Sequence, residues 1–359
     1  MGTGAYVIAA GGTGGHIYPG IALAEEIQRQ QPGVPIVFVG TARGLEGKLV
    51  PQAGFPLEIL SVTGFMGKSF PERMGALARL PGAFAEARAL LLRLEARAVA
   101  GVGGYVSLPV IAAARWLGIP TLIHEPNARP GLANRLCNRF ATRTTVGLEA
   151  ANRILTQPGL VTGTPVRRAF FGVPKLDPEA STRRVLVFGG SQGSRVLNRL
   201  ISKVAPLLQP LQLEVIHQTG QQEFVAARKR YYKVPPGWRI EPFLPRMWEE
   251  LAWADLVVSR AGAMTVAELA AAGRPAILVP LASSTEGHQL ANALAMSEAG
   301  AALTVREEEL EANRFAAALE ELLQNRKRLA KMGQNARSLA KPEAAKQIVD
   351  MLFEAENQK

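Results

Sequence analysis

The stretch Arg260-Ala-Gly-Ala-Met-Thr-Val-Ala-Glu-Leu-Ala-Ala-Ala-Gly-Arg-Pro275 decides the fold prediction. It follows the apolar run Asp255–Ser259, which is typical of a buried strand, and it turns at Gly262 into a predicted helix that ends at Gly273. A helix N-terminus behind a glycine turn presents free backbone N–H groups and binds anions. Glu268, one turn into the helix, is placed to accept hydrogen bonds from two neighbouring hydroxyls, as on a ribose. An α/β protein without a ligand here would show the same pattern. Other glycine turns in the chain must therefore show whether this one belongs to a ligand site.

Two further glycine turns follow strands in the same way. The apolar run Ala5–Ala10 leads into Gly11-Gly-Thr-Gly-Gly-His16, and Arg184–Phe188 leads into Gly189-Gly-Ser-Gln-Gly-Ser194 with a helix to about Leu208. Strands and helices alternate along both halves of the chain, which predicts two Rossmann-like, doubly wound parallel sheets. Because ligands bind at the carboxyl ends of parallel strands, we expect the two domains to face each other across a central cleft.

The other predicted elements fill the same alternating scheme. Further strands are expected at 34–40, 56–61, 98–102, 120–124, 141–146, 211–217, 237–241 and 275–279. Helices are expected at 72–97 with a break at Pro81, at 107–117, 129–138 and 286–299, and in the tail from 307 with a break near Pro342. Residues 156–183, rich in Pro, Gly and polar residues, are predicted to link a first domain, 1–163, to a second, 164–341.

Composition limits the class of protein. The 359 residues suffice for two full cores, and 48% of them are hydrophobic, as in globular enzymes. The single cysteine, Cys137, excludes an internal disulfide and a thiolate-rich metal site. The net charge of +11 is spread over both halves and favours anionic partners. The longest uncharged run, 98–114, is interrupted by glycines and a proline, and no secretory signal is evident, so we expect a cytoplasmic, non-integral protein.

His16 ends the first glycine turn. The turn lacks the G-x-G-x-x-G spacing, since Ile17 stands where the third glycine would fall, and no acid follows the second strand, so a dinucleotide is not expected. A lone histidine is more often structural than catalytic. At the tip of a glycine turn, however, an imidazole faces the ligand, and its unperturbed pKa of about 6.5 suits a general base.

Other polar residues are candidates for contacts to a phosphate or a sugar. Arg167 follows a proline in the predicted linker, where it could pair with a phosphate, and Ser191 lies at a helix start that suits a diphosphate. The side chain of Gln289 could bond sugar hydroxyls or merely cap its helix. The only aspartates are Asp177, Asp255 and Asp350, so no D-x-D pair exists to hold a metal. We therefore expect no metal and no cofactor.

Seven motifs together resemble the MurG family of bacterial glycosyltransferases. They are GGTGGH (11–16), GGYVSLP (103–109), HEPN (124–127), GTPVR (163–167), GGSQGSR (189–195), SRAGAMTVAEL (259–269) and GHQLANA (287–293). Single motifs are weak, but the series covers nearly the whole chain in matching order. Enzymes of this family move N-acetylglucosamine from its UDP form onto undecaprenyl-diphosphate-linked N-acetylmuramoyl pentapeptide (lipid I). The product, lipid II, is the precursor of peptidoglycan, on which cell shape and division depend.

The resemblance implies a GT-B glycosyltransferase. Its C-terminal domain would bind the UDP-sugar, and its N-terminal domain would face the lipid acceptor at the cytoplasmic face of the inner membrane. The last helix, 342–359, would pack back on the first domain. The reaction would invert the anomeric carbon as the muramoyl 4-hydroxyl attacks C1. His16 is the candidate base, with Glu125 and His124 in reserve.

The resemblance also assigns substrate contacts. The implied donor contacts are Thr13, Gly14, Gly15, Asn127, Arg167, Ser191, Leu244, Ala263, Met264, Thr265, Glu268 and Gln289, and the acceptor-side contacts are Gly104 and Tyr105. The backbone at Leu244 would read uracil, Glu268 would hold the ribose, and Gln289 would contact the sugar. Two departures concern the acceptor side more than the donor: the family usually has Gln at Pro126 and often Asn at Thr164.

A membrane contact is predicted between Phe65 and Arg97. That region combines the apolar residues Phe65, Met66, Phe70, Leu77, Leu80 and Phe84 with the cations Lys68, Arg73, Arg79, Arg88, Arg93 and Arg97. Apolar residues beside basic ones suit shallow binding to an anionic surface, although a core helix with a solvated basic face has the same composition. No nucleic-acid partner is expected.

Three other functions remain open from the sequence. A UDP-N-acetylglucosamine 2-epimerase would share the fold and need no lipid. A related lipid glycosyltransferase acting on diacylglycerol would differ in its acceptor. A nucleotide-binding scaffold at the membrane would show no turnover. Product analysis and acceptor assays separate these functions.

Overall fold

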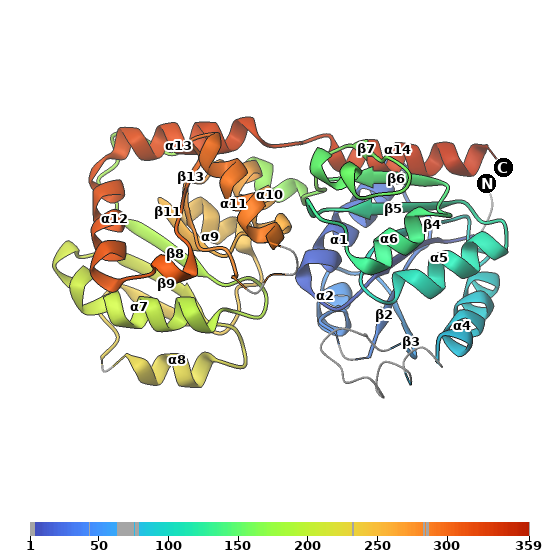
Figure 1. The fold of residues 1–359 in the computed structure, drawn as a ribbon, viewed down its shortest axis with the longest axis horizontal. Coiled ribbons are helices and arrows are strands. Elements are labelled where there is room, and N and C mark those ends of the chain that lie inside the picture. Colours follow the sequence, from blue (N-terminus) through green and yellow to red (C-terminus); the bar gives the residue numbers. More distant parts are fainter. Residues whose placement is uncertain are drawn as a thin grey trace. The chain divides into compact units, whose positions relative to one another are not determined.

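The computed structural model describes residues 4–42, 44–62, 75, 79–231, 233–282, 284 and 287–358. The chain forms two compact units, one of Met1–Arg167 with Lys341–Lys359 and one of Arg168–Ala340 (Figure 1). Each unit holds one parallel sheet with helices on its faces, which confirms the predicted fold class of two Rossmann-like domains. The predicted boundary fell between 163 and 164, whereas Thr164–Arg167 belong to the first unit.

The first unit contains seven parallel strands in the order β3-β2-β1-β4-β5-β6-β7. They are β1 (Tyr6–Ala10), β2 (Ile36–Thr41), β3 (Leu57–Leu60), β4 (Ala98–Gly103), β5 (Thr121–Glu125), β6 (Arg143–Val146) and β7 (Leu160–Val161). The expectation that 141–146 closes this sheet is wrong, because β7 adds two residues to its edge from within the predicted linker. Buried apolar residues on both sides of β1 and β4 explain their nearly unbroken hydrophobic sequences.

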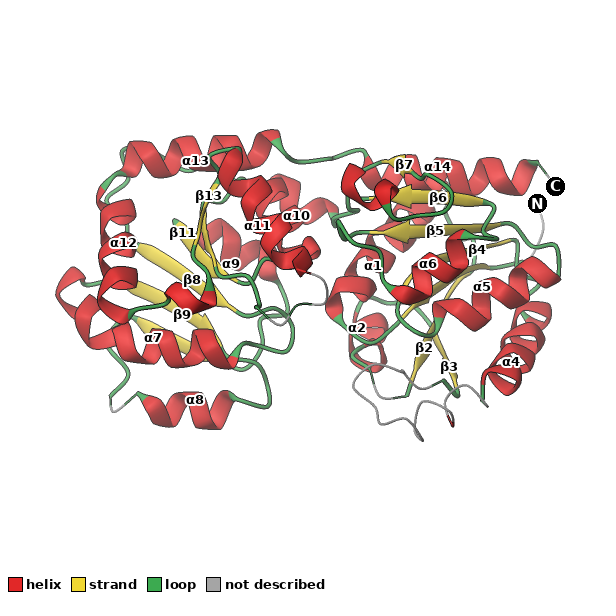
Figure 2. Cartoon of the chain, in the orientation of Figure 1, coloured by secondary structure: helices red, strands yellow, loops and turns green. Residues whose placement is uncertain are grey.

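Six described helices flank this sheet. They are α1 (Gly14–Gln30), α2 (Glu46–Gln52), α4 (Leu80–Arg93), α5 (Ser107–Trp116), α6 (Leu132–Asn138) and α14 (Ala344–Asn357). α1 packs against α2 and α14, and α5 packs between α4 and α6 (Figure 2). Pro81 does not break a helix as predicted but lies in the first turn of α4, where its missing N–H costs nothing.

The second unit contains six parallel strands in the order β10-β9-β8-β11-β12-β13. They are β8 (Arg184–Phe188), β9 (Glu214–Gln218), β10 (Trp238–Glu241), β11 (Leu256–Ser259), β12 (Ala276–Leu278) and β13 (Ala302–Thr304). The register pairs Phe188 with both Gln218 and Ser259, so β8, β9 and β11 end at the same level. The turns that follow these three strands therefore lie side by side.

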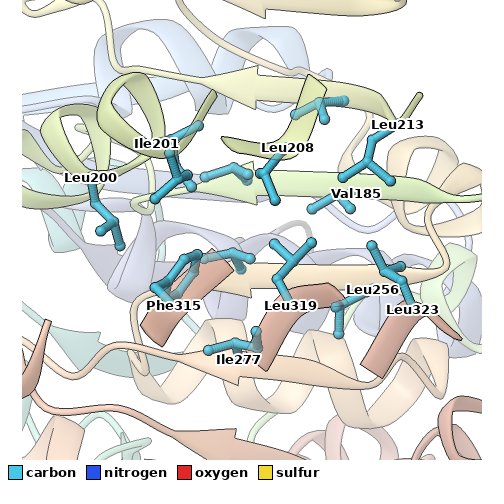
Figure 3. Packing of buried hydrophobic residues seen from close by; sticks show 14 of the residues in the cluster. Val185, Leu200, Ile201, Leu208, Leu213, Leu256, Ile277, Phe315, Leu319 and Leu323 are labelled. Carbon is cyan, nitrogen blue, oxygen red and sulfur yellow. The ribbon is translucent and has the colours of Figure 1, made fainter. Parts of the chain in front are cut away.

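The described helices of the second unit bury a core against this sheet. They are α7 (Arg195–Leu208), α8 (Phe224–Arg230), α9 (Met247–Trp253), α10 (Ala263–Ala272), α11 (His288–Glu298), α12 (Ala312–Gln324) and α13 (Arg326–Ser338). Figure 3 shows Leu200, Ile201 and Leu208 of α7 in one cluster with the sheet residue Val185 and with Phe315 and Leu319 of α12. The apolar stripe of α7 is thus buried, and its first turn remains at the carboxyl end of β8.

Half-buried polar contacts hold the C-terminal helix α14 to the sheet of the first unit. The Tyr6 hydroxyl donates to Glu356 Oε2 at 2.5 Å, and Arg97 Nε lies 2.7 Å from Glu356 Oε1. The Arg97 guanidinium lies 4.7 Å from the centroid of the Tyr6 ring, and Phe353 packs on the same ring. Arg97 is therefore paired with the C-terminal helix in a half-buried contact, whereas the sequence suggested a cation at a membrane surface.

Candidate active site

Each sheet reverses its winding direction once, and the predicted site residues gather at these two points. In the first unit the reversal lies between β1 and β4, and in the second between β8 and β11. Ligands of open α/β sheets bind outside the carboxyl ends of the strands at such a switch point. Each switch point is described below within its own unit.

The turn after β8 brings one helix N-terminus to the second switch point. Gly190 and Gly193 have φ of 86° and 78°, a region that favours glycine. A Cβ at Gly193 would lie 2.0 Å from Thr219 O, so no side chain fits there. The Ser194 hydroxyl caps α7 by accepting from Leu197 N at 3.3 Å, while Ser191 is half-buried in the turn. The turn is thus a close-fitting backbone cradle in front of a helix dipole.

The turn after β11 brings a second helix N-terminus to the same point. α10 begins at Ala263 with Gly262 as its N-cap, and Gly273 ends it with φ of 61°, as predicted. Thr265 lies in the first turn of α10 and is buried, as is Met264. Glu268 is buried one turn on. A glycine cap contributes no side-chain acceptor, so the first N–H groups of α10 suit an anionic ligand.

Two buried side chains hold this second turn in place. Asn292 Nδ2 donates to Ala261 O at 3.0 Å, and Arg260 Nη1 donates to Val279 O at 3.1 Å. Arg260 also forms an ion pair with Glu307, and its burial lowers the pKa of the guanidinium while Glu307 raises it. These contacts join the ends of β11 and β12 to α11, and they fix the backbone just before the N-terminus of α10.

Two further predicted donor contacts follow the strands β10 and β12 of the second unit. Leu244 is buried shortly after β10. Gln289 is half-buried near the start of α11, and its Oε1 accepts from Leu281 N at 3.0 Å. The amide oxygen of Gln289 therefore fixes the loop after β12, while its NH2 group is the part suited to a sugar hydroxyl.

His16 stands at the switch point of the first unit, within the predicted glycine turn. Its Nδ1 lies 3.1 Å from Gly11 O. A carbonyl only accepts, so Nδ1 carries the proton and the lone pair of the neutral ring lies on Nε2. A Cβ at Gly104 would come 2.4 Å from Gly11 O, so the turn after β4 rests directly on the turn after β1. The turn that carries Thr13, Gly14 and Gly15 thus meets the turn that carries Gly104 and Tyr105.

Glu46 supports this turn and was not foreseen from the sequence. Its fully buried carboxylate accepts from Gly12 N at 3.0 Å and from Thr41 N and Oγ1, each at 2.7 Å. It therefore ties the end of β2 to the turn that carries His16. No sequence signal marks it, because a single glutamate at a helix start is common. Ser107 acts similarly from α5, donating to Ala9 O and accepting from Gly103 N.

Of the two reserve bases, Glu125 already accepts hydrogen bonds at both oxygens, and His124 is buried. Glu125 accepts at Oε1 from the backbone and side-chain N–H groups of Asn127, and at Oε2 from Gly131 N and Asn134 Nδ2, at 2.8–3.0 Å. His124 is fully buried beside Thr145 Oγ1, and burial lowers the pKa of its imidazole to about 3. Both side chains therefore shape the loop after β5, and His16 stays our candidate base.

Arg167 is the last residue of the first unit. Its guanidinium lies 4.6 Å from the centroid of the Tyr18 ring on α1. Burial raises the pKa of the Glu25 carboxyl, also on α1, and the nearby Arg167 charge partly offsets that rise. The guanidinium that the sequence predicts as a phosphate contact thus stacks on a tyrosine ring near an acid, and this stacking fixes its orientation.

Neither a metal cluster nor a spanning helix occurs among the residues described. In those parts of the chain no three His, Cys, Asp or Glu side chains gather as metal ligands do. Over the same residues, no helix combines the length and apolar character that crossing a bilayer requires.

Comparisons with known proteins agree with this geometry. A glycosyltransferase family 28 N-terminal domain matches residues 6–146, and a family 28 C-terminal domain matches residues 184–348. The UDP-N-acetylglucosamine–N-acetylmuramyl-(pentapeptide) pyrophosphoryl-undecaprenol N-acetylglucosamine transferase of Myxococcus xanthus (strain DK1622) is 41% identical over 349 residues, covering 96% of this chain and 91% of that protein. The transferase of the same name from Halorhodospira halophila (strain DSM 244 / SL1) is 42% identical, covering 97% of each. The crystal structure of Acinetobacter baumannii MurG superposes with a TM-score of 0.75 at 31% identity, covering 98% of this chain and 99% of that one.

Proposed function

The chain belongs to glycosyltransferase family 28, and on that premise we propose that it transfers N-acetylglucosamine from UDP-N-acetylglucosamine to lipid I. The acceptor atom is the 4-hydroxyl of the N-acetylmuramoyl pentapeptide on undecaprenyl diphosphate. The product is lipid II. The observation that carries the donor half of this proposal is the pair of helix N-termini, α7 and α10, at the switch point between β8 and β11.

The donor occupies the second unit in this proposal. A nucleoside diphosphate has two charges to neutralise, and the first turns of α7 and α10 supply backbone N–H groups and positive dipole ends for them. Glu268 accepts from the ribose hydroxyls, and the backbone at Leu244 bonds the uracil. Since the leaving group is met by fixed dipoles, the charge that develops on UDP is stabilised without reorganisation.

The acceptor is activated in the first unit. The 4-hydroxyl attacks C1 of N-acetylglucosamine and loses its proton to His16 Nε2, whose lone pair is free in the tautomer set by Gly11 O. The C1–O bond to the diphosphate breaks as the new bond forms, so UDP leaves and the configuration at C1 inverts. Glu46 and Ser107 are positioning residues for this base.

We also propose that the protein lies peripherally on the cytoplasmic face of the inner membrane through α4 and α5. Trp116 is 76% exposed and Leu92 51% exposed, and the Phe84 and Trp116 rings meet edge to face at 6.4 Å. Arg79 at the start of α4, Arg88 within it and Arg115 in α5 are exposed as well. Of the residues predicted for this contact, Phe65, Met66, Lys68, Phe70, Arg73 and Leu77 lie outside the described part of the chain. Aromatic and basic side chains together suit an anionic lipid surface.

Co-sedimentation with vesicles tests the membrane contact. Binding to vesicles of anionic lipid should exceed binding to zwitterionic ones and should fall when Trp116→Ala or Arg88→Glu is introduced. Lys331→Glu, an exposed charge reversal on α13 in the second unit, is the matched control. Binding that ignores both lipid charge and the two variants would sink the proposal.

Acceptor dependence tests the catalytic proposal. We expect UDP release from UDP-N-acetylglucosamine only when lipid I or a short-chain analogue is present. A 2-epimerase would instead change the sugar without any lipid, and a diacylglycerol transferase would release UDP with that lipid and not with lipid I.

A further inference from the structure

A buried chain of hydrogen bonds runs through the second unit, beneath its switch point. Tyr231 Oη lies 2.7 Å from His217 Nδ1, and His217 Nε2 lies 3.0 Å from Asn198 Oδ1. Asn198 Nδ2 then donates to Thr219 O at 2.9 Å. His217 and Asn198 are fully buried, and Tyr231 is 7% exposed. These hydrogen bonds thus join Tyr231 after helix α8, His217 in strand β9 and Asn198 in helix α7.

The direction of every bond in this chain is determined by its last member. Thr219 O only accepts, so the Asn198 amide presents N–H groups to it and its oxygen to His217. An amide oxygen only accepts, so His217 Nε2 carries the proton and Nδ1 accepts from the Tyr231 hydroxyl. Burial lowers the pKa of His217 to about 3, which keeps one proton on the ring throughout the neutral range. A single arrangement of protons therefore satisfies all four groups.

Thr219, the last member of this chain of hydrogen bonds, contacts both of the loops that the proposed function assigns to the donor. A Cβ of Gly193 would lie 2.0 Å from Thr219 O, and a Cβ of Gly220 would lie 2.1 Å from Gln192 O. The Thr219–Gly220 backbone is thus pressed against the turn that carries Ser191. Thr219 N and Oγ1 also donate to Glu241 O, at 2.9 and 3.2 Å, at the end of β10 and ahead of Leu244.

We propose that the Tyr231–His217–Asn198 chain positions Thr219, and through it sets the spacing between the diphosphate turn 189–194 and the uracil loop after β10. This inference deepens the proposed function and rests on it, since it concerns how the donor nucleotide is held. The three residues touch no substrate atom and are positioning residues. Their loss should weaken nucleotide binding while leaving the acceptor's KM unchanged, because the acceptor lies on the first unit in the proposed function.

Two substitutions break the chain at different points. Asn198→Asp replaces the donor to Thr219 O by an oxygen that repels it, and His217→Leu removes the donor to Asn198. His217→Gln keeps an N–H near the position of Nε2 and should rescue binding. Isothermal titration with UDP should give a dissociation constant at least tenfold higher for the first two variants, and within about threefold of the parent for His217→Gln. The donor KM should follow, with acceptor KM unchanged.

Matched measurements separate positioning from loss of fold. Ser202→Ala removes a hydroxyl that donates to Arg199 O on the exposed face of α7, and it should leave UDP affinity unchanged. If Asn198→Asp does not fold, Tyr231→Phe is the milder variant, because it removes only the hydroxyl that donates to His217. It should raise the dissociation constant of UDP about threefold. Unchanged UDP affinity in every folded variant, with only the melting temperature lowered, would overturn the inference.

Hydrogen exchange tests the inference apart from the proposed function. Without nucleotide, the amides of 189–194 should exchange faster in His217→Leu and Tyr231→Phe than in the parent and in Ser202→Ala. Equal exchange overturns the inference whatever the protein binds. If the parent binds no UDP but the variants still exchange faster than the parent, the proposed donor is contradicted. The effect of the hydrogen bonds on the turn 189–194 is then supported.

Discussion

The ring of His16 lies against the backbone of Gly103: a Cβ built on Gly103 would come 2.6 Å from His16 Cδ2 and 3.0 Å from Nε2. Gly103 ends β4 with φ of 113°, so glycine is required there for its conformation and for the space it leaves. The position of the candidate base therefore depends on a residue that has no side chain.

Gly103→Ala should reduce turnover by displacing that imidazole. A shift of about 1 Å in a catalytic group costs on the order of 100-fold, and loss of a general base costs about 100- to 10,000-fold, which is our expectation for His16→Ala. UDP affinity should stay within a few fold in both variants, since the diphosphate contacts of the proposed function lie mainly in the second unit. Gly54→Ala is the matched control, with φ of 84° and nothing within 4 Å of the added carbon. Near-parental turnover in His16→Ala would remove this residue from the mechanism.

Glu268→Gln should weaken donor binding. A charged acceptor of hydrogen bonds contributes about 1.5–3 kcal/mol, which corresponds to roughly one to two decades in affinity. Calorimetric titration with UDP measures the change, and Glu308→Gln, an exposed acid in the same unit, is the control. An unchanged dissociation constant in Glu268→Gln would show that this carboxylate serves the helix and not the ribose.

Donor use should be uridine-specific and independent of divalent metal. In the proposed function the N-termini of α7 and α10 neutralise the diphosphate, and the backbone at Leu244 reads the base. Initial rates in excess EDTA should equal those with magnesium, and UDP-N-acetylglucosamine should be strongly preferred over the GDP-sugar. Abolished activity in EDTA, or equal use of both donors, would contradict this view of the site.

Acid should destabilise the fold through its buried histidines. Burial lowers the pKa of His124 and of His217 to about 3, below the value of about 6.5 in an unfolded chain. Between these values the unfolded state binds the extra proton, so the free energy of unfolding falls as pH is lowered through 6.5. Each histidine contributes about 1.4 kcal/mol per pH unit below that value.

Chemical denaturation at pH 7 and pH 5 checks this expectation. The loss of stability between the two pH values should be smaller in His124→Gln than in the parent, because glutamine does not titrate. A variant with the parental pH dependence would show that the ring is not held neutral by burial.

Much of the fold was predictable because its signals are local. The strand–glycine–helix pattern at 184–208 and at 255–273 appears in the structure as β8–α7 and β11–α10, and Gly273 ends α10 with the left-handed backbone expected of a C-cap. β7 was missed because a two-residue edge strand has no periodicity to detect. β13 was missed for the same reason, since it spans only Ala302–Thr304.

The candidate site was predictable only in part. His16 was found because it ends a glycine turn. Glu46, His217 and Asn198 could not be found, because their partners are brought to them by the sheet, as with Gly12 N, 34 positions before Glu46. The engagement of Glu125 by Asn134 likewise appears only once the loop after β5 has folded.

The most direct test of the account is the identity of the product formed from radiolabelled UDP-N-acetylglucosamine and lipid I. We expect one UDP released for each lipid-linked disaccharide formed, with a β(1→4) bond between N-acetylglucosamine and the muramoyl residue, established by mass spectrometry and by the coupling of the anomeric proton. An α-linked disaccharide, a free epimerised sugar nucleotide, or label that never enters the lipid fraction would contradict it.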